Sequence, residues 1–156
     1  MSLSSKQLAS RLSQVILNGT WIANTNYKDQ LTNLDYKIAI YKYNNLNSIA
    51  ELTFHISYYI EGILAYFNTG KLTIKDKHSF NLPKINNQDE WENLLTNFWK
   101  QTERLLSKIE ELSESDFTKP FFNIAYGDYL RNINGLIEHA YYHLGQIVLI
   151  KKLISK

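Results

Sequence analysis

Two histidines lie four residues apart near the end of the chain, in the segment EHAYYHLGQI at residues 138–147. Residues at positions i and i+4 lie one above the other on the same face of an α-helix, so His139 and His143 point in the same direction. Neutral imidazoles at this spacing can each present a nitrogen to one metal ion at about 2.0–2.1 Å. The pair therefore predicts two ligands of a metal site.

A third ligand has to come from another segment, and His55 is the one further histidine that falls on an apolar helical face. Three protein ligands leave a coordination position open, which is typical of a catalytic rather than a structural metal. The alternative is that the three histidines are hydrogen-bonded core residues. Burying His139 and His143 together without a ligand is costly, because each ring needs a polar partner and two protonated rings would repel. The residues alone leave both interpretations open.

Three further side chains are candidates for contact with a ligand or substrate. Gln146 lies one turn beyond His143, where it could hydrogen-bond a metal ligand or a substrate. Tyr59 lies one turn beyond His55, and Tyr142 lies three residues after His139. Either tyrosine could donate a proton, with core packing as the alternative for each. His78 lies in the polar, lysine-rich segment IKDKHSF and is predicted to be exposed to solvent.

Other catalytic signatures do not match. HAYYH is not H-E-x-x-H, because Ala140 stands where the general base would be. The Glu-x-x-His pairs of di-iron bundles are missing, since Glu51 and His55 are one residue too far apart. The sequence contains no G-x-S-x-G, P-loop or G-x-G-x-x-G motif, which leaves acyl-hydrolase, nucleotidase and dinucleotide-binding functions without support.

The elements that must position these side chains are predicted to be helices. Hydrophobic residues at helical spacing predict long helices over residues 5–17, 48–69, 88–112 and 128–154, with Ser4, Ser48 and Asn87 as N-caps. Shorter helices are predicted over residues 27–33 and 36–41. A polar crossover spans residues 70–87, and Pro120 breaks the helical pattern over residues 113–127. An all-α four-helix bundle, forming a single domain over residues 1–156, is the economical fold.

Composition narrows the class of protein further. Hydrophobic residues make up 44% of the 156 residues and charged residues 21%, which is ordinary for a globular domain. The net charge of +2 is not gathered into a basic block, so nucleic-acid binding is not expected. The chain has no cysteine, which excludes disulfides and thiolate ligands. No apolar run approaches the ~20 residues that span a bilayer, and the N-terminus lacks a signal-peptide core, so a cytoplasmic protein without membrane contact is expected.

At the histidine segments the chain resembles the DinB-like (DinB/YfiT-like) superfamily of metalloenzymes. The matching stretches are NSIAELTFHISYYIEGIL with His55 and GLIEHAYYHLGQIVLIKKL with His139 and His143, together with the GTWIANT turn. The resemblance implies an up-down-down-up four-helix bundle that carries a divalent metal, nickel or zinc, on these three histidines. It also implies a homodimer. Characterised members of the family are thiol transferases that use mycothiol, bacillithiol or glutathione, and isomerases or hydrolases of thiol adducts.

Two functional hypotheses follow from these residues and this resemblance. The first is a metal-dependent S-transferase or hydrolase that binds a low-molecular-weight thiol at the open metal position. The metal would lower the pKa of the thiol, and the thiolate would attack an electrophile. The second is a non-catalytic, dimeric stress-related or interaction protein whose metal site is vestigial or adventitious.

Overall fold

The structure, a computed structural model, describes residues 4–155, so the outermost residues of the expected domain (1–3 and 156) lie outside the described part. The regular structure of residues 4–155 is helical, which confirms the all-α prediction. The α-helices are α1 (Ser5–Ser13), α2 (Tyr27–Leu31), α3 (Tyr36–Ile40), α4 (Ile49–Thr69), α5 (Gln88–Glu110) and α6 (Tyr129–Ile154). Short 3₁₀ turns interrupt the connecting segments at Asp76–His78, Glu114–Asp116 and Ile124–Tyr126.

The predicted N-caps are all present. The side chain of Ser4 accepts a hydrogen bond from the backbone of Gln7 at the start of α1, and Ser48 accepts one from Glu51 at the start of α4. In both capping boxes the residue at the third helical position also accepts a hydrogen bond from the backbone of the cap. These bonds satisfy N–H groups that would otherwise lack a partner at a helix start, so they fix where the long helices begin.

The first helix ends differently from the prediction. The α-helical pattern stops at Ser13 and the chain continues as one π-helical turn, Gln14–Asn18. Gly19 then ends the helix in an extended conformation, and a Cβ atom at this position would overlap Gln14. The glycine is therefore required by the close approach of the chain to the preceding turn.

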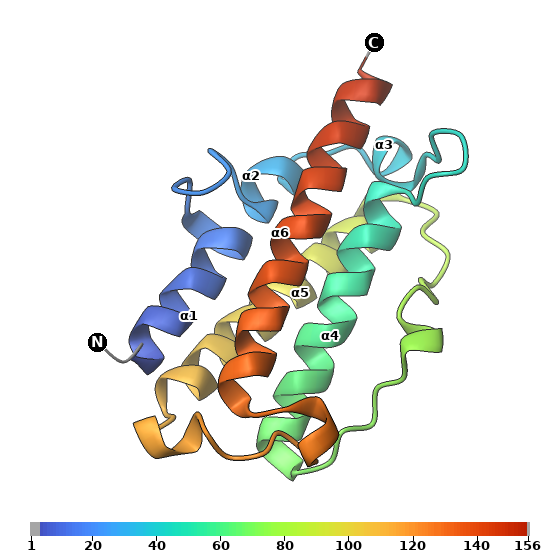
Figure 1. Cartoon of the computed structure of the whole chain (residues 1–156). Coiled ribbons are helices and arrows are strands. Elements are labelled where there is room, and N and C mark those ends of the chain that lie inside the picture. Colours follow the sequence, from blue (N-terminus) through green and yellow to red (C-terminus); the bar gives the residue numbers. More distant parts are fainter. Residues whose placement is uncertain (1–3, 156) are drawn as a thin grey trace.

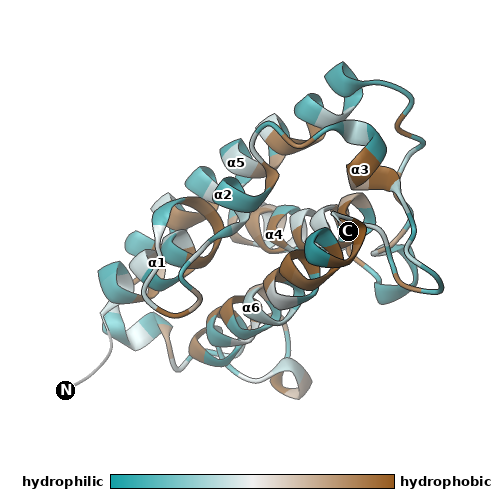
Figure 2. Cartoon of the chain, turned by 90° about the horizontal axis from the view of Figure 1, so that it is seen from above, coloured by the Kyte–Doolittle hydropathy of each residue, from teal (hydrophilic) through white to brown (hydrophobic). Residues whose placement is uncertain are grey.

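The four long helices pack side by side, with α2 and α3 at the end where α4 begins (Figure 1). Helix α5 contacts both α1 and α4, and α6 likewise contacts both α1 and α4. Hydrophobic and hydrophilic residues alternate around the turns of α1, α4 and α5, as amphipathic helices require (Figure 2). The hydrophobic sides enclose one core, whose largest fully buried side chains are Trp91, Tyr27, Phe98, Phe121, Leu8 and Leu12.

Helix α4 is buried on more sides than one apolar stripe would require. His55 and Ile56 are buried as the stripe predicts, but Thr53, Ser57 and Ile60 are buried as well. Thr53 satisfies its hydroxyl by donating to the carbonyl of Ile49. Because α4 contacts α5 on one side and α6 on another, it is buried on both sides and places His55 in the core.

The crossover from α4 to α5 returns along the outside of the bundle (Figure 1). Gly70 ends α4 in the left-handed conformation, with φ of 69°, which favours glycine. The crossover then packs against α4 at the buried Gly62, where an added Cβ atom would overlap the side chain of Ile74. The missing side chain at position 62 therefore lets residues 74–80 lie close to α4.

We predict that Gly62→Ala destabilises the protein by about 1–3 kcal/mol, because the new methyl group overpacks the contact with Ile74. Gly145→Ala is the matched control, since this glycine lies in α6 with open space around it. Alanine there should stabilise the helix by about 0.5–1 kcal/mol. Urea unfolding of both variants measures the two effects, and equal shifts would contradict the tight contact between α4 and the crossover.

Candidate metal centre

The three predicted histidines converge at one point between α4 and α6. His55 comes from α4, and His139 and His143 come from successive turns of α6. The Nε2 atom of His139 lies 3.1 Å from Nε2 of His55 and 2.9 Å from Nε2 of His143. His55 and His143 are each only 6% exposed, and His139 is half-buried. Three imidazole nitrogens, from segments that are 84 residues apart in sequence, thus lie close together between two helices.

These separations suit nitrogens that share one ion. Two nitrogens that would each lie about 2.0–2.1 Å from one metal ion can be at most about 4.2 Å apart, and the separations of 3.1 and 2.9 Å are within this limit. The donor atoms of the three residues all lie within 4.8 Å of one another. The geometry of the group therefore fits a single metal ion.

Hydrogen bonds on the far side of two rings fix where their protons lie. Nδ1 of His55 lies 3.3 Å from the carbonyl oxygen of Ser79, and Nδ1 of His143 lies 2.6 Å from Oε1 of Gln146. Both partners are oxygens that only accept, so each Nδ1 carries the proton and donates it. In a neutral ring Nε2 is then a lone pair, which is the form that binds a metal.

The lone pairs of His55 and His143 both face Nε2 of His139. A neutral His139 carries one ring proton, which can satisfy one of the two neighbours and not both. Without a cation, at least one of the two close Nε2 pairs therefore brings two lone pairs together with no proton between them. A metal ion would accept all three lone pairs at once, so the polar chemistry of the group also fits a metal.

Burial keeps the three rings neutral. It lowers the pKa of His55 from the ordinary 6.5 to about 4, with a further lowering from the neighbouring His143 and His139. Burial also lowers the pKa of His139 and of His143. Neutral imidazole is the ligand form, so this environment favours metal binding at neutral pH.

The crossover closes one side of the centre. Besides the Ser79 carbonyl it supplies Phe80, whose ring stacks on His55 at a centroid distance of 4.0 Å. It also supplies Asp76, which accepts a hydrogen bond from the Tyr59 hydroxyl at 2.8 Å. The ring of Tyr59 in turn contacts the edges of His55 and His139. These contacts hold His55 in one orientation.

Helix α2 anchors the other side. The buried Tyr27 donates a hydrogen bond from its hydroxyl to the carbonyl oxygen of Ala140 at 2.9 Å. Burial raises the pKa of Tyr27 well above its usual value, so the phenol keeps this proton. The bond fixes α6 directly beside His139.

The structure places the other predicted residues in different roles. Gln146 contacts His143 from outside, as described above. Tyr59 lies beside the histidines, half-buried, and its proton is directed to Asp76. Tyr142 touches His143 edge-on but is 63% exposed, so the alternative of core packing is wrong for this residue. His78 is exposed and pairs with Asn81, as predicted for a surface histidine.

The sequence reasoning missed Asp76, Ser79 and Phe80. All three lie in the crossover, which the sequence marks only as polar and irregular. Ser79 acts through its backbone carbonyl, and any residue type could supply that group. The aromatic Phe80 two residues after His78 was the one available signal, since a large apolar ring in a polar segment has to pack against something.

The surface beside the centre is hollowed along the groove between α4 and α6. One hollow of about 260 Å³ has His139 and Tyr59 in its wall, together with Ile63, Tyr126 and Arg131. A second hollow of about 310 Å³ shares Tyr59, Ile63, Tyr126 and Asn132 with the first and extends to the crossover. The two hollows share part of their walls and form one cleft, in which His139 is the one histidine of the group that lines the wall.

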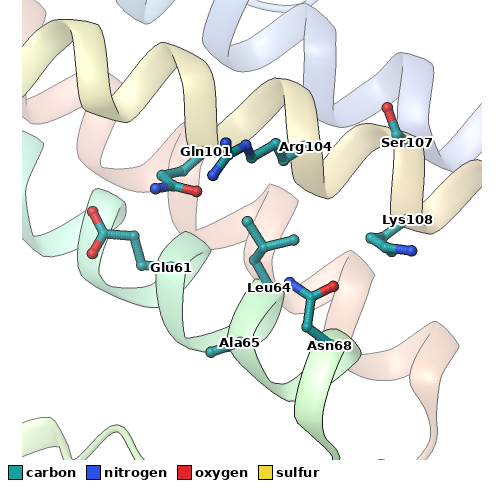
Figure 3. Close-up of a pocket in the computed structure, with 8 residues that line it drawn as sticks. All are labelled: Glu61, Leu64, Ala65, Asn68, Gln101, Arg104, Ser107 and Lys108. Atoms are coloured by element: carbon teal, nitrogen blue, oxygen red, sulfur yellow. The ribbon is translucent and has the colours of Figure 1, made fainter.

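Another hollow, of about 550 Å³, lies between α4 and α5 (Figure 3). Its wall includes Glu61, Gln101 and Arg104 but none of the three histidines. Glu61 accepts a hydrogen bond from Asn97 at 2.6 Å, so its carboxylate already has a partner. The larger hollow is therefore separate from the candidate metal centre.

The helices and the site define a helical protein with a three-histidine group that can hold a metal ion. The chain belongs to the DinB superfamily, whose family model matches residues 33–147. The match includes all three histidines and Gln146, whereas the GTWIANT turn and α1 precede it. Neither the curated proteins nor the solved structures contain a match to this chain.

No helix within residues 4–155 has the length and apolar character that crossing a bilayer demands.

We predict that the metal-free protein loses stability as the pH falls from about 6.5 towards 4. The depressed histidine pKa values mean that the folded state binds fewer protons than the unfolded chain in this window, so acid favours unfolding. Above the ordinary pKa of 6.5 the full stability is present. Urea midpoints of chelator-treated protein between pH 7.5 and 5 measure the effect.

The control variants are His55→Gln and His78→Gln. The first should flatten the pH dependence, and the second should leave it unchanged because His78 is exposed. Glu90 and Asp116 have pKa values below the ordinary carboxyl range, so they titrate outside the chosen window. A pH dependence that survives His55→Gln unaltered would contradict the assignment.

Proposed function

We propose that His55, His139 and His143 bind one divalent metal ion, nickel or zinc, and that the protein uses it as a thiol S-transferase or hydrolase. The observation that carries the proposal is that Nε2 of His139 lies 2.9 Å from Nε2 of His143 and 3.1 Å from Nε2 of His55, with the opposite ring nitrogens of His55 and His143 donating to oxygens. Three ligands leave further coordination positions for a small molecule.

The donor set supports the choice of metal. Imidazole nitrogen suits zinc, nickel, copper and iron, whereas magnesium and calcium prefer carboxylate and carbonyl oxygen. The chain has no cysteine, and the donor group contains no carboxylate. A divalent ion at such a site supplies a Lewis acid that lowers the pKa of a bound thiol or water.

Several residues around the histidines orient the proposed metal ligands and line the cleft. Ser79 and Gln146 hold His55 and His143 in the tautomer that directs Nε2 inward. Tyr59 and Asp76 form a hydrogen-bonded pair in the wall of the cleft. Burial and the bond to Asp76 raise the pKa of Tyr59, so its phenol stays protonated at neutral pH. Asp76 is the one carboxylate among the residues that line the two hollows.

We also propose that α1, α4, α5 and α6 form an up-down-down-up four-helix bundle. In Figure 1, α1 and α6 run towards the end where the C-terminus lies, and α4 and α5 run in the opposite direction. The long crossover between two parallel neighbours, α4 and α5, supports the same topology.

We expect the purified protein to contain about one divalent metal ion per chain, and His143→Ala to lose it. Metal analysis by mass spectrometry measures the content, with His78→Ala as the control that retains it. Metal should also raise the thermal midpoint of the chelator-treated protein, since a ligand that binds only the folded state stabilises it. Absence of bound metal and no response of the thermal midpoint would overturn the proposal.

Gln146→Leu should weaken metal binding by about 10–100-fold while the protein stays folded, because the variant removes the acceptor of the His143 Nδ1 proton. Gln146→Glu retains an acceptor and should bind metal at least as well as the wild-type protein. Competition with a chromogenic chelator gives both affinities. Equal affinities in all three proteins would show that Gln146 does not orient His143.

Thiol binding is tested in cobalt-substituted protein. Coordination of a thiolate produces a sulfur-to-cobalt charge-transfer absorption, which we expect on addition of glutathione or 2-mercaptoethanol. A metal-containing protein whose spectrum ignores every thiol would favour the second candidate function, a non-catalytic protein with an adventitious metal site.

A further inference from the structure

The cleft that starts at the candidate metal centre continues along α6 in one direction. Its wall contains Arg131, Asn132, Gly135, Leu136 and His139, which are spaced so that they share one face of that helix. On the opposite side it is lined by Tyr59 and Ile63, one and two turns beyond His55 on α4. The cleft therefore runs from His139 towards the N-terminal end of α6.

Arg131 lies at the far end of this cleft. Its backbone N–H is capped by Asp128, but within residues 4–155 its guanidinium group forms no hydrogen bond or ion pair. Tyr126 and Asn132 line the same hollow. The amide nitrogen of Asn132 donates to two backbone carbonyls, so its side chain is held in place beside the arginine.

Within residues 4–155 the guanidinium group of Arg131 forms no ion pair, although the Asp128 carboxylate accepts the backbone N–H of the same residue. The adjoining hollow is lined by Lys75 and Asp76, a cation and an anion, and Asp76 also accepts the Tyr59 proton. The Arg131 guanidinium can bind one carboxylate through two parallel N–H donors.

We propose that this cleft binds an elongated small molecule whose one end reaches the histidines and whose carboxylate is bound by Arg131. A single unpaired guanidinium suits a monoanionic carboxylate better than a doubly charged phosphate. The middle of the cleft is lined by Ile63 and Leu136, which suits an apolar or mixed linker. The identity of the ligand group at the histidines rests on the proposed function, whereas the carboxylate site at Arg131 does not.

The spacing of Arg131 and His139 on α6 predicts the length of the ligand. Arg131 and His139 are eight residues apart, which corresponds to about 12 Å along the axis of α6. Long helical side chains lean towards the N-terminus, so the arginine does not shorten this distance by reaching back. A short thiol such as 3-mercaptopropionate therefore cannot engage both ends, whereas 8-mercaptooctanoate approaches the required span.

The test titrates cobalt-substituted protein with 8-mercaptooctanoate and with 8-mercaptooctan-1-ol, and reads the sulfur-to-cobalt absorption. The wild-type protein should prefer the carboxylate by about tenfold in Kd, as expected for a charge-assisted hydrogen bond. Arg131→Gln should abolish the preference, and Arg131→Lys should retain part of it. Because the guanidinium group has no partner in the described residues, these variants should keep the wild-type thermal midpoint.

Arg104→Gln is the matched control. Arg104 is likewise an exposed arginine without a guanidinium partner in the described part of the chain, but it lines the hollow between α4 and α5. Its loss should leave the tenfold preference intact. A preference that disappears in Arg104→Gln and persists in Arg131→Gln would overturn the proposal.

A second experiment needs no metal and tests the carboxylate site at Arg131 separately from the proposed thiol chemistry. Octanoate added to chelator-treated protein should perturb the NMR signals of the Arg131 side chain, and its Kd should rise about tenfold in Arg131→Gln. If neither thiol alters the cobalt spectrum while octanoate still binds through Arg131, the proposed thiol chemistry fails and the carboxylate site stands. Equal octanoate affinity in wild type and Arg131→Gln would overturn the carboxylate site itself.

Discussion

The close approach of three imidazole nitrogens inside the helical core is the constraint on which the other features of the site depend. Polar rings in an apolar setting are stable only when each has a partner, and here two of them use their outer nitrogens to donate to oxygens. The inner nitrogens of His55 and His143 are left as lone pairs that meet at His139. The cost of that meeting is what makes a bound cation the natural occupant, while burial is the main cause of the lowered histidine pKa values.

Holding the three rings together requires parts of the chain that are far apart in sequence. Helix α4 supplies one ring and α6 two, while the crossover contributes an acceptor, an aromatic cover and a carboxylate. Gly62 permits the crossover to approach α4, and Tyr27 from α2 holds α6 beside His139. The connecting segments are thus part of the site's architecture as much as the long helices are.

The starts of the long helices and the pairing of His139 with His143 were predictable because both depend on local rules. Ser48 with Glu51 and Asn87 with Glu90 mark helix starts through bonds to near neighbours in sequence, and the spacing of His139 and His143 fixes their shared face. The crossover was not predictable, since its contacts depend on tertiary packing and on a backbone carbonyl. The π-helical turn after Ser13 was likewise hidden, because nothing in that stretch distinguishes it from a regular helical continuation.

The partner of the His55 ring is a main-chain oxygen, and this has a consequence for how such a protein can change over evolutionary time. Substituting residue 79 leaves this oxygen in place, so the contact with His55 depends on the path of the chain, while the buried hydroxyl of Ser79, which donates to the carbonyl of Asp76, limits which residue types fit. The number of residues between Gly70 and that carbonyl cannot drift in the same way, because one insertion would carry the oxygen past the ring. Selection that preserves the contact with His55 would therefore act on the length of this segment more than on its residue types.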